Sequence, residues 1–397
     1  MPTSSATEQP AAREERTAVY DAAQYLIEPP DLWTSRLPSK LMEWAPKVVT
    51  LEGGGEAWSF QGGAWLRPLG LNTAAGRGPL DLAEDGYRYS ELRTGTFDAA
   101  ERLNDMDLDG TDRAALFPTF GLEVRSIREA ALHRACVRAY NDGVADWVSR
   151  ANGRIDAHAI LPLTGLDDAM AELNHAIELG FRGVVFGGWP SGEEKPQPED
   201  DRFWGRCAEA GMVVALVKGG QLGDRTPVAP ARYAKPDDGV RVVDVPPETR
   251  MASEATIKNV PLAWLTLTGV LDRFAALNLA LIGCGAGWLR YCGELFDWNF
   301  RYAQFLAFTK LREHPSEYLR RQVKATIDRE RYVVEMVDDA WATGLLWASH
   351  YPTHMSTWPD SRPYLETLLG DIRSKRAQLL LRGNYEALYP SRTRGPS

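Results

Sequence analysis

Histidine and cysteine are scarce in this chain of 397 residues, which contains six histidines and four cysteines. The cysteines include no Cys-x-x-Cys pair, so the sequence implies no disulfide framework and favours reduced thiols in a cytoplasmic protein. No run approaches the roughly 20 consecutive apolar residues that a membrane-spanning helix requires. No short internal repeat occurs either, which argues against a solenoid or a propeller.

Positive charge is not in surplus, because the net charge is −9 and the lysines and arginines are spread along the chain. This pattern argues against a nucleic-acid or anionic-membrane partner. Residues 1–17 are polar and lack the apolar core of a signal peptide or membrane anchor, so we expect a disordered tail there. A second short tail is expected at 391–397. Thirteen tryptophans favour a large core and a partner interface.

Short apolar runs followed by amphipathic helical patterns recur along the rest of the chain. Helical spacing of apolar residues is found, for example, over 126–151, 165–180 and 331–344. Continuous apolar runs that alternate with helices are typical of parallel strands, and eight of them predict a single (β/α)₈ TIM barrel over residues 18–390. An open doubly wound sheet is the alternative, for which the sequence has no Gly-rich phosphate loop. The eight candidate strands are 18–25, 113–119, 155–163, 182–187, 212–218, 278–283, 322–327 and 344–349.

Two segments interrupt this alternation. Residues 51–104 begin with a pattern that predicts a hairpin, followed by a Gly/Pro-rich loop. Residues 219–260 form a long segment rich in Pro, Asp and Gly after the fifth predicted strand. Because both insertions follow strands, we expect them on the C-terminal face of the barrel, where TIM-barrel enzymes carry their active sites.

Several motifs together resemble one family. They lie at 26–49 (containing EPPDLW), 103–121, 139–147, 269–288 (ending GCGAGW), 314–323 and 351–361 (YPTHMSTWPDS). In combination they resemble the amidohydrolase-related family of metal-dependent hydrolase TIM barrels, the branch that contains aminocarboxymuconate semialdehyde decarboxylase. The resemblance runs from about residue 18 to residue 390 and implies a divalent metal held by imidazole and carboxylate groups at strand ends.

The residues at the family's ligand positions depart from that pattern. Where the family has an acid-x-His pair on its first strand, this chain has Ala23 and Tyr25. The histidine of the fifth strand is replaced by Val217, and the glutamate of the sixth by Gly283. The aspartate of the eighth-strand Ser-Asp-Tyr-Pro-His motif is replaced by His350. The resemblance therefore implies a barrel that has kept its fold and lost its family metal site.

Four residues remain as candidates for chemistry. His350 is either a residual ligand or general base, or a polar side chain that fills the former metal position. His354 and His158 are weak candidates for residual zinc or iron ligands, since Pro352 argues against one helical face for His350 and His354. Lys218 is a candidate amine with a lowered pKa, although a paired or solvated lysine is the commoner case.

Two further residues have an expected structural role. Glu28 in the EPPDLW motif is expected to anchor the loop after the first strand. Cys284 is a conceivable nucleophile, but a buried small hydrophobic side chain is the preferred interpretation because no base is placed beside it by the sequence.

Retention of the fold motifs without the ligands leads us to expect a pseudoenzyme. Such a degenerate-site, non-catalytic subunit would stabilise or shape a homologous catalytic TIM-barrel subunit in a heterodimer or heterotetramer. In this respect the chain resembles the metal-poor subunit of the two-component 2-aminoisobutyrate hydroxylase, an oxygen-activating monooxygenase. The resemblance implies a dinuclear iron or iron/manganese centre in the partner and no cofactor in this chain.

Two alternatives stay open. The first is a stand-alone metal-dependent hydrolase or decarboxylase with an atypical site around His350. The second is a sensor that binds a small molecule in the emptied cavity, which would show as ligand-dependent thermal stabilisation without turnover.

Overall fold

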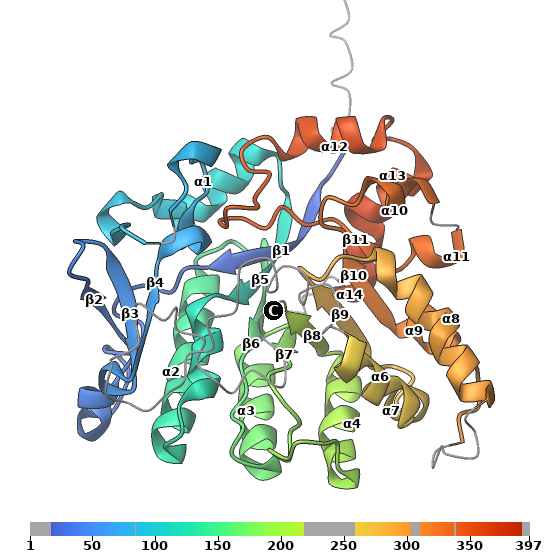
Figure 1. Ribbon diagram of the computed structural model, residues 1–397, viewed down its shortest axis with the longest axis horizontal. Helices are drawn as coiled ribbons and strands as arrows, with labels where there is room; N and C mark the ends of the chain where they lie inside the picture. Colours follow the sequence, from blue (N-terminus) through green and yellow to red (C-terminus); the bar gives the residue numbers. More distant parts are fainter. Residues whose placement is uncertain (1–16, 84, 218–258, 303–309, 337–338, 391–397) are drawn as a thin grey trace, which may run out of the picture.

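Eight parallel strands form the centre of the molecule. The computed structural model describes residues 17–83, 85–217, 259–302, 310–336 and 339–390. The strands are hydrogen-bonded in chain order, and all eight predicted strands are confirmed. The chain therefore forms the predicted (β/α)₈ barrel (Figure 1). The strands are β1 (Tyr20–Leu26), β5 (Arg113–Pro118), β6 (Ile155–Ala159), β7 (Gly183–Val185), β8 (Val213–Val217), β9 (Asn278–Ile282), β10 (Val323–Thr326) and β11 (Leu345–Leu346).

Backbone hydrogen bonds between the first strand and the end of the last one close the barrel. The amide of Ala22 donates to the carbonyl oxygen of Trp347 at 2.8 Å, and the amide of Tyr25 donates to that of Tyr351 at 2.7 Å. Pairing of this kind leaves no open sheet edge at the seam. It also brings the residues that follow β11 directly against β1.

Small and apolar side chains fill the barrel interior. All five residues of β8 are buried, which explains why the sequence shows a continuous apolar run there rather than alternation. Alanines supply much of the inner wall and leave room for aromatic rings between the strands. The inner cluster is made of Ala22, Ala23, Ala115, Phe117, Val185, Val213, Ala215, Val217, Ala280, Ile282, Leu346, Ala348, Tyr385, Leu388 and Tyr389.

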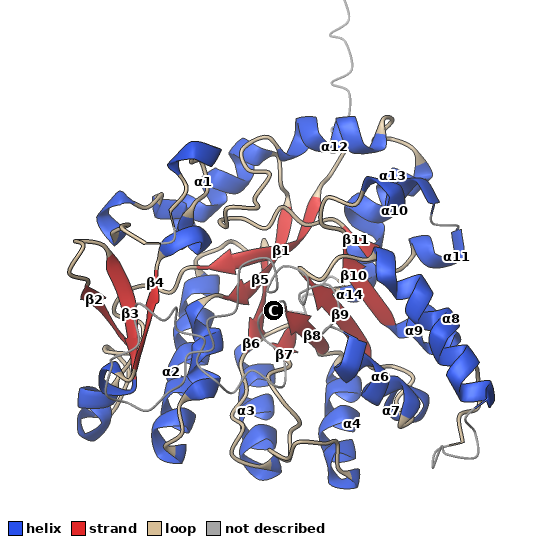
Figure 2. Ribbon diagram, viewed as in Figure 1, coloured by secondary structure: helices blue, strands red, loops and turns tan. Residues whose placement is uncertain are grey.

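Helices surround the strands (Figure 2). Two of the predicted helices are confirmed by α2 and α3, and the third is represented by α10 and α11, with residues 337–338 outside the described part. No described helix is long and apolar enough to cross a membrane. The helices are α1 (Ala99–Asp109), α2 (Ala130–Ser149), α3 (Leu166–Leu179), α4 (Asp201–Ala210), α6 (Asn259–Leu267), α7 (Val270–Arg273), α8 (Gly287–Tyr302), α9 (Pro315–Gln322), α10 (Arg331–Met336), α11 (Asp339–Ala342), α12 (Ser361–Leu369), α13 (Lys375–Gln378) and α14 (Asn384–Leu388).

Two tyrosines, one near the start of α14 and one directly after it, join the inner cluster and bond to β6. The hydroxyl of Tyr385 donates to the carboxylate of Asp156 at 2.7 Å. The hydroxyl of Tyr389 lies 3.0 Å from Nε2 of His158. These four side chains are at most 5 % exposed. We call α14 and Tyr389 the base plug, because Asp156 lies at the start of its strand and thus at the N-terminal end of the barrel.

The first insertion contains the predicted hairpin, and one further strand pairs with it to form a three-stranded antiparallel sheet. Its strands are β2 (Lys47–Thr50), β3 (Glu56–Phe60) and β4 (Trp65–Pro68), so it starts before residue 51. The predicted hairpin is β3 with β4, and the strand that was not predicted is β2, a run of four residues of which none is buried. Almost all of the second predicted insertion, 219–260, lies outside the described residues.

Candidate functional site

The first barrel strand contains a bulge that turns an aspartate into the seam. The pairing of β1 with β5 shifts between Asp21 and Gln24. The carboxylate of Asp21 accepts hydrogen bonds from the Ala23 amide, the Gln24 side chain, and both the amide and hydroxyl of Ser349. Burial raises the pKa of the Asp21 carboxyl. With its four donors, this side chain fixes the end of the last strand to the first.

His350 follows that seam and has an unusual backbone conformation. Its φ is 59°, in the left-handed region that is uncommon for residues other than glycine. The backbone amide donates to the carbonyl oxygen of Ala23 at 3.1 Å. The imidazole Nε2 lies 2.9 Å from Oδ1 of Asp328, and the ring stacks on Tyr25 with centroids 6.3 Å apart. A non-glycine residue held in this region is a marker of functional sites.

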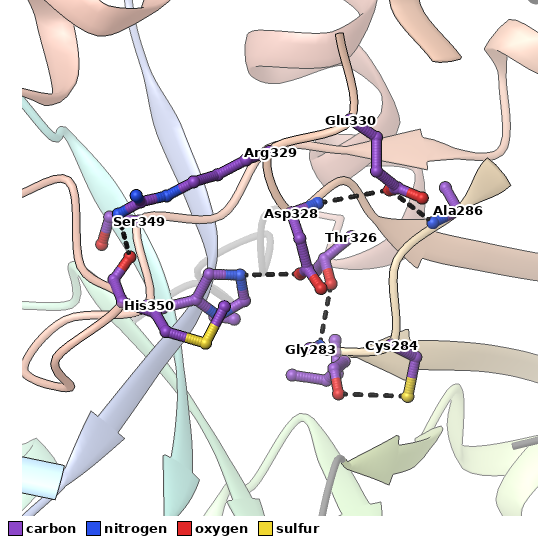
Figure 3. Close-up of polar contacts among 12 residues, drawn as sticks. Gly283, Cys284, Ala286, Thr326, Asp328, Arg329, Glu330, Ser349 and His350 are labelled. Carbon is purple, nitrogen blue, oxygen red and sulfur yellow. Dashed lines mark hydrogen bonds and ion pairs between the residues drawn. The ribbon is translucent and has the colours of Figure 1, made fainter. Parts of the chain in front are cut away.

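Asp328 comes from the loop after β10, which a second acidic residue ties to α8. The carboxylate of Glu330 accepts the amides of Ala286 and Gly287 at 2.8 and 3.0 Å. Figure 3 shows the imidazole of His350 directed at Asp328, with Glu330 turned away toward Ala286. The loops after β9 and β10 are therefore fixed to each other, which positions Asp328 as the partner of the imidazole.

Apart from His350, the residues at the family's ligand positions do not supply metal donors. Ala23 and Val217 are fully buried apolar residues. The amide of Gly283 donates to the hydroxyl of Thr326 at 2.9 Å. Burial raises the pKa of the Tyr25 phenol, so this side chain stays protonated. Among the residues described, no group of three or more His, Cys, Asp or Glu side chains could hold a metal ion. The divalent ion of the family does not fit these residues.

His158 contacts residues other than His350 and Asp328. Its Nδ1 lies 3.3 Å from the carbonyl oxygen of Leu116, and its Nε2 contacts Tyr389 in the base plug. Its ring stacks on Phe117 at 4.2 Å. Burial lowers the pKa of this imidazole to about 3, so it is neutral at ordinary pH. Both ring nitrogens have protein partners, which argues against His158 as a ligand.

The two other candidates are His354, which lies at the surface, and Lys218, which lies outside the described residues. His354 is exposed, whereas His350 is 8 % exposed. No helix is present between them, as Pro352 predicted. Lys218 is outside the described residues.

Glu28 anchors a loop, as predicted. Its carboxylate accepts the backbone amides of Thr119, Phe120 and Gly121 at 2.8 to 3.1 Å. Burial raises the pKa of this carboxyl to about 7, against the opposing effect of the three amides. The loops after β1 and β5 are thereby joined at one point.

Cys284 is a buried thiol that bonds to the backbone. Its sulfur lies 3.4 Å from the carbonyl oxygen of Ile282. In Figure 3 the thiol points along this loop rather than toward His350. This arrangement agrees with the preferred interpretation of Cys284 as a buried small side chain.

Sequence reasoning missed Asp328 and Asp21. Asp328 stands two residues after β10 in the sequence KATIDRE, and an acid at the C-terminal end of a barrel strand is a signal for the active-site face. Asp21 lies two residues before Ala23, and only a bulge brings its carboxylate to the seam. No sequence signal of that bulge is apparent.

Comparisons with known proteins agree with the fold. A model of the amidohydrolase family, Amidohydro_2, matches residues 55–390. No curated protein matches the sequence. Among solved structures, an amidohydrolase, map2389c, from Mycobacterium avium subsp. paratuberculosis K-10 is similar with a TM-score of 0.72 and 18 % identity, over 96 % of this chain and 100 % of that one.

Two further structures are similar at lower scores. An IDCase from Metarhizium anisopliae in apo form has a TM-score of 0.63 and 17 % identity, over 94 % of this chain and 96 % of that one. A dihydroxybenzoic acid decarboxylase from Polaromonas sp. JS666, with bound manganese and the inhibitor 2-nitroresorcinol, has a TM-score of 0.60 and 14 % identity, over 94 % and 97 %. At these identities the likeness shows the fold alone.

Proposed function

The chain belongs to the amidohydrolase family, and we propose that it is an enzyme of the hydrolase or decarboxylase type in which His350 and Asp328 transfer the proton. The observation that carries this proposal is the His350 side chain, fixed at the end of β11 against the Asp328 carboxylate 2.9 Å away. A strained backbone conformation at the active-site face of a barrel supports it.

The geometry assigns a role to each nitrogen of the imidazole. A carboxylate accepts hydrogen bonds, so Nε2 carries the proton that it donates to Asp328. Nδ1 of the neutral ring is then a proton acceptor, and it has no hydrogen-bond partner among the described residues. Asp328 orients the ring and stabilises the imidazolium that forms when Nδ1 takes a proton, as the aspartate of a catalytic triad does.

Two reaction types use such a pair. In hydrolysis, Nδ1 takes the proton of the attacking water and the imidazolium returns it to the leaving group. In decarboxylation, the imidazolium gives its proton to the carbon that loses carbon dioxide. Neither reaction is routed through a divalent ion, since the described residues do not fit one.

A small carboxylic acid is the substrate class to test first. One similar structure is named as a decarboxylase of dihydroxybenzoic acid, and 2,6-dihydroxybenzoate and 5-carboxyvanillate decarboxylases are similar as well. The four cysteines are all buried thiols, which supports our proposal that the enzyme works in the cytoplasm.

Substitution of the pair tests the proposal. The purified chain is incubated with small aromatic and aliphatic carboxylic acids and with their esters and amides, and carbon dioxide and hydrolysis products are measured. Asp328→Asn and His350→Asn are each expected to lower turnover by about 10² to 10⁴-fold. Asparagine tolerates the left-handed conformation, so His350→Asn is expected to keep the fold.

The surface pair of His175 and Asp142, 2.6 Å apart, provides a matched control. His175→Asn removes a similar histidine–aspartate contact between α3 and α2 and is expected to leave turnover unchanged. Turnover that survives both substitutions of the site pair would contradict the assignment.

A second candidate is the non-catalytic subunit, and the replaced ligand positions favour it. Ala23, Val217 and Gly283 cannot bind a metal, so this chain would stabilise or shape a homologous catalytic barrel in a heterodimer or heterotetramer. We would then expect the metal, a dinuclear iron or iron/manganese centre of a hydroxylase of a small amino acid such as 2-aminoisobutyrate, in the partner.

Co-purification separates the two candidates. The tagged chain is isolated from its native cells, and its companions and metal content are determined. A subunit role predicts a homologous barrel at fixed stoichiometry, together with inactivity and very little metal in the chain purified alone. Turnover by the lone chain that depends on His350 would rule this role out.

A further inference from the structure

Exposed aromatic and apolar side chains are concentrated on one side of the barrel wall. Eleven large hydrophobic side chains of the described residues are well exposed. Six of them come from three helices in the region 259–336, α6, α8 and α10, while the others are scattered. These six are Val260, Trp264, Tyr291, Trp298, Tyr302 and Tyr332.

Three of the six form a stripe along α8, a 16-residue helix at the outer edge of the molecule (Figure 1). Tyr291, Trp298 and Tyr302 are 64, 61 and 55 % exposed. They are seven and four residues apart, so they lie on one face of the helix. The opposite face is buried through Leu289, Cys292, Gly293 and Phe296. We call the exposed face the α8 stripe.

The α8 stripe is ordered by contacts of its own. The rings of Trp298 and Tyr302 lie 4.2 Å apart, and the guanidinium of Arg301 lies 5.7 Å from the Tyr302 ring. Clustered aromatic residues beside an arginine have the composition of the central part of a protein interface. A lone exposed aromatic is common on a monomer, whereas a contiguous patch marks an interaction site.

We propose that the α8 stripe binds a second copy of this chain, with the two α8 helices antiparallel about a twofold axis beside Trp298. In an antiparallel pair, residues at equal distances before and after the axis face each other. Glu294 and Arg301 are seven residues apart, two helical turns, and thus share the face that carries Trp298. An axis midway between them sets Glu294 of each copy opposite Arg301 of the other.

This charge pattern selects the second copy as the occupant. Glu294 lies four residues before Trp298 and Arg301 three residues after it, so two copies turned about an axis midway between these two residues form two identical ion pairs. Glu294 also lies 3.5 Å from Arg290, but both side chains are at least half exposed, so that contact is weak and exchangeable. Because the stripe carries charges of both signs, it does not match a partner surface whose charges are all basic or all acidic.

The proposed dimer does not depend on the proposed function, because the α8 stripe lies outside the His350 site.

The test is the oligomeric state of the full chain, measured by analytical ultracentrifugation over a dilution series that includes about 10 μM. The natural sequence is expected to be a dimer. Trp298→Ala is expected to raise the dimer dissociation constant by about thirtyfold or more, the effect of a central tryptophan in an interface. Trp44→Ala, which removes an exposed tryptophan elsewhere (46 % exposed), is expected to leave it unchanged.

Charge exchange tests the orientation. Glu294→Arg and Arg301→Glu each set like charges opposite one another, so each alone is expected to weaken the dimer. The double variant E294R/R301E restores opposite charges in this antiparallel arrangement and is expected to recover dimerisation. Circular dichroism and thermal unfolding confirm that each variant is folded.

Three outcomes would overturn the proposal. A natural-sequence chain that is monomeric at about 10 μM has no self-association of this kind. A double variant no stronger than either single one excludes the antiparallel pairing. A chain that is monomeric alone but binds a different barrel through Trp298 assigns the stripe to that partner instead of a second copy.

Discussion

At the scale of single residues, the direction of the His350 side chain is fixed from three sides. The backbone amide is held by Ala23, the imidazole by Asp328, and one ring face by Tyr25. A left-handed conformation costs an L-residue roughly 1 to 2 kcal/mol, so these contacts maintain a geometry that the isolated residue would not choose. In the proposed function, the imidazole is thus oriented before a substrate arrives, which makes proton transfer efficient.

Glu28 leads to a stability prediction at the same scale. Its two carboxylate oxygens accept three backbone amides, and the side chain is fully buried. Glu28→Gln replaces one acceptor oxygen with an NH₂ group, which sets a donor against an amide donor. We expect a loss of about 1 to 3 kcal/mol in the free energy of unfolding, measured by urea denaturation. The control is Glu129→Gln, at an exposed helix cap whose carboxylate also accepts backbone amides. If both variants lost the same free energy of unfolding, burial would not explain the effect at Glu28.

At the scale of elements, the contact between α1 and α12 contains a buried acid. Asp109 is the last residue of α1, is 4 % exposed, and accepts the amide of Ser361 at the start of α12 at 2.9 Å. Its second carboxylate oxygen has no hydrogen-bond partner. Burial raises the pKa of this carboxyl from 3.8 to about 6. The protonated form is therefore the one that the contact between the two helices favours.

A pH dependence of stability follows from Asp109. The folded state holds the proton more tightly than the unfolded state, so the contribution is full below about pH 4 and is lost as the pH rises through about 6. Asp109→Asn is expected to remove this dependence and to be more stable than the natural sequence at pH 7, by up to about 2 to 3 kcal/mol. Urea denaturation at pH 4, 5, 6 and 7 measures the free energy of unfolding of both proteins. If the two free energies changed with pH in parallel, the pH dependence would not come from Asp109.

At the scale of the whole molecule, the sequence predicted the barrel better than the site. Most residues of the eight strands are buried, and several strands, such as β8, leave a continuous apolar run that can be read locally. The His350–Asp328 pair joins residues 22 positions apart in different loops, and only the barrel brings them together. The bulge at Asp21 depends on pairing with Ser349, more than 300 residues away, which no local pattern records.

The functional interpretation changes accordingly. The replaced ligand positions predicted a barrel without its family metal, and this stays a prediction. The same replacements led us to expect a non-catalytic subunit, but the partner of His350 was not visible in the sequence. An acid opposite that histidine makes proton transfer possible without the family's ligands, and the enzyme therefore becomes the first candidate.

The base plug also has a consequence for synthesis of the protein. Tyr385 and Tyr389 complete the inner cluster of the barrel and bond to β6, which precedes them by more than 200 residues. Ribosomes add residues at about 5 to 20 per second, so the early strands emerge many seconds before the side chains that fill the space between them. The interior of the barrel stays incomplete until residue 389 has left the ribosome, and a growing chain must protect its apolar strands from aggregation until then.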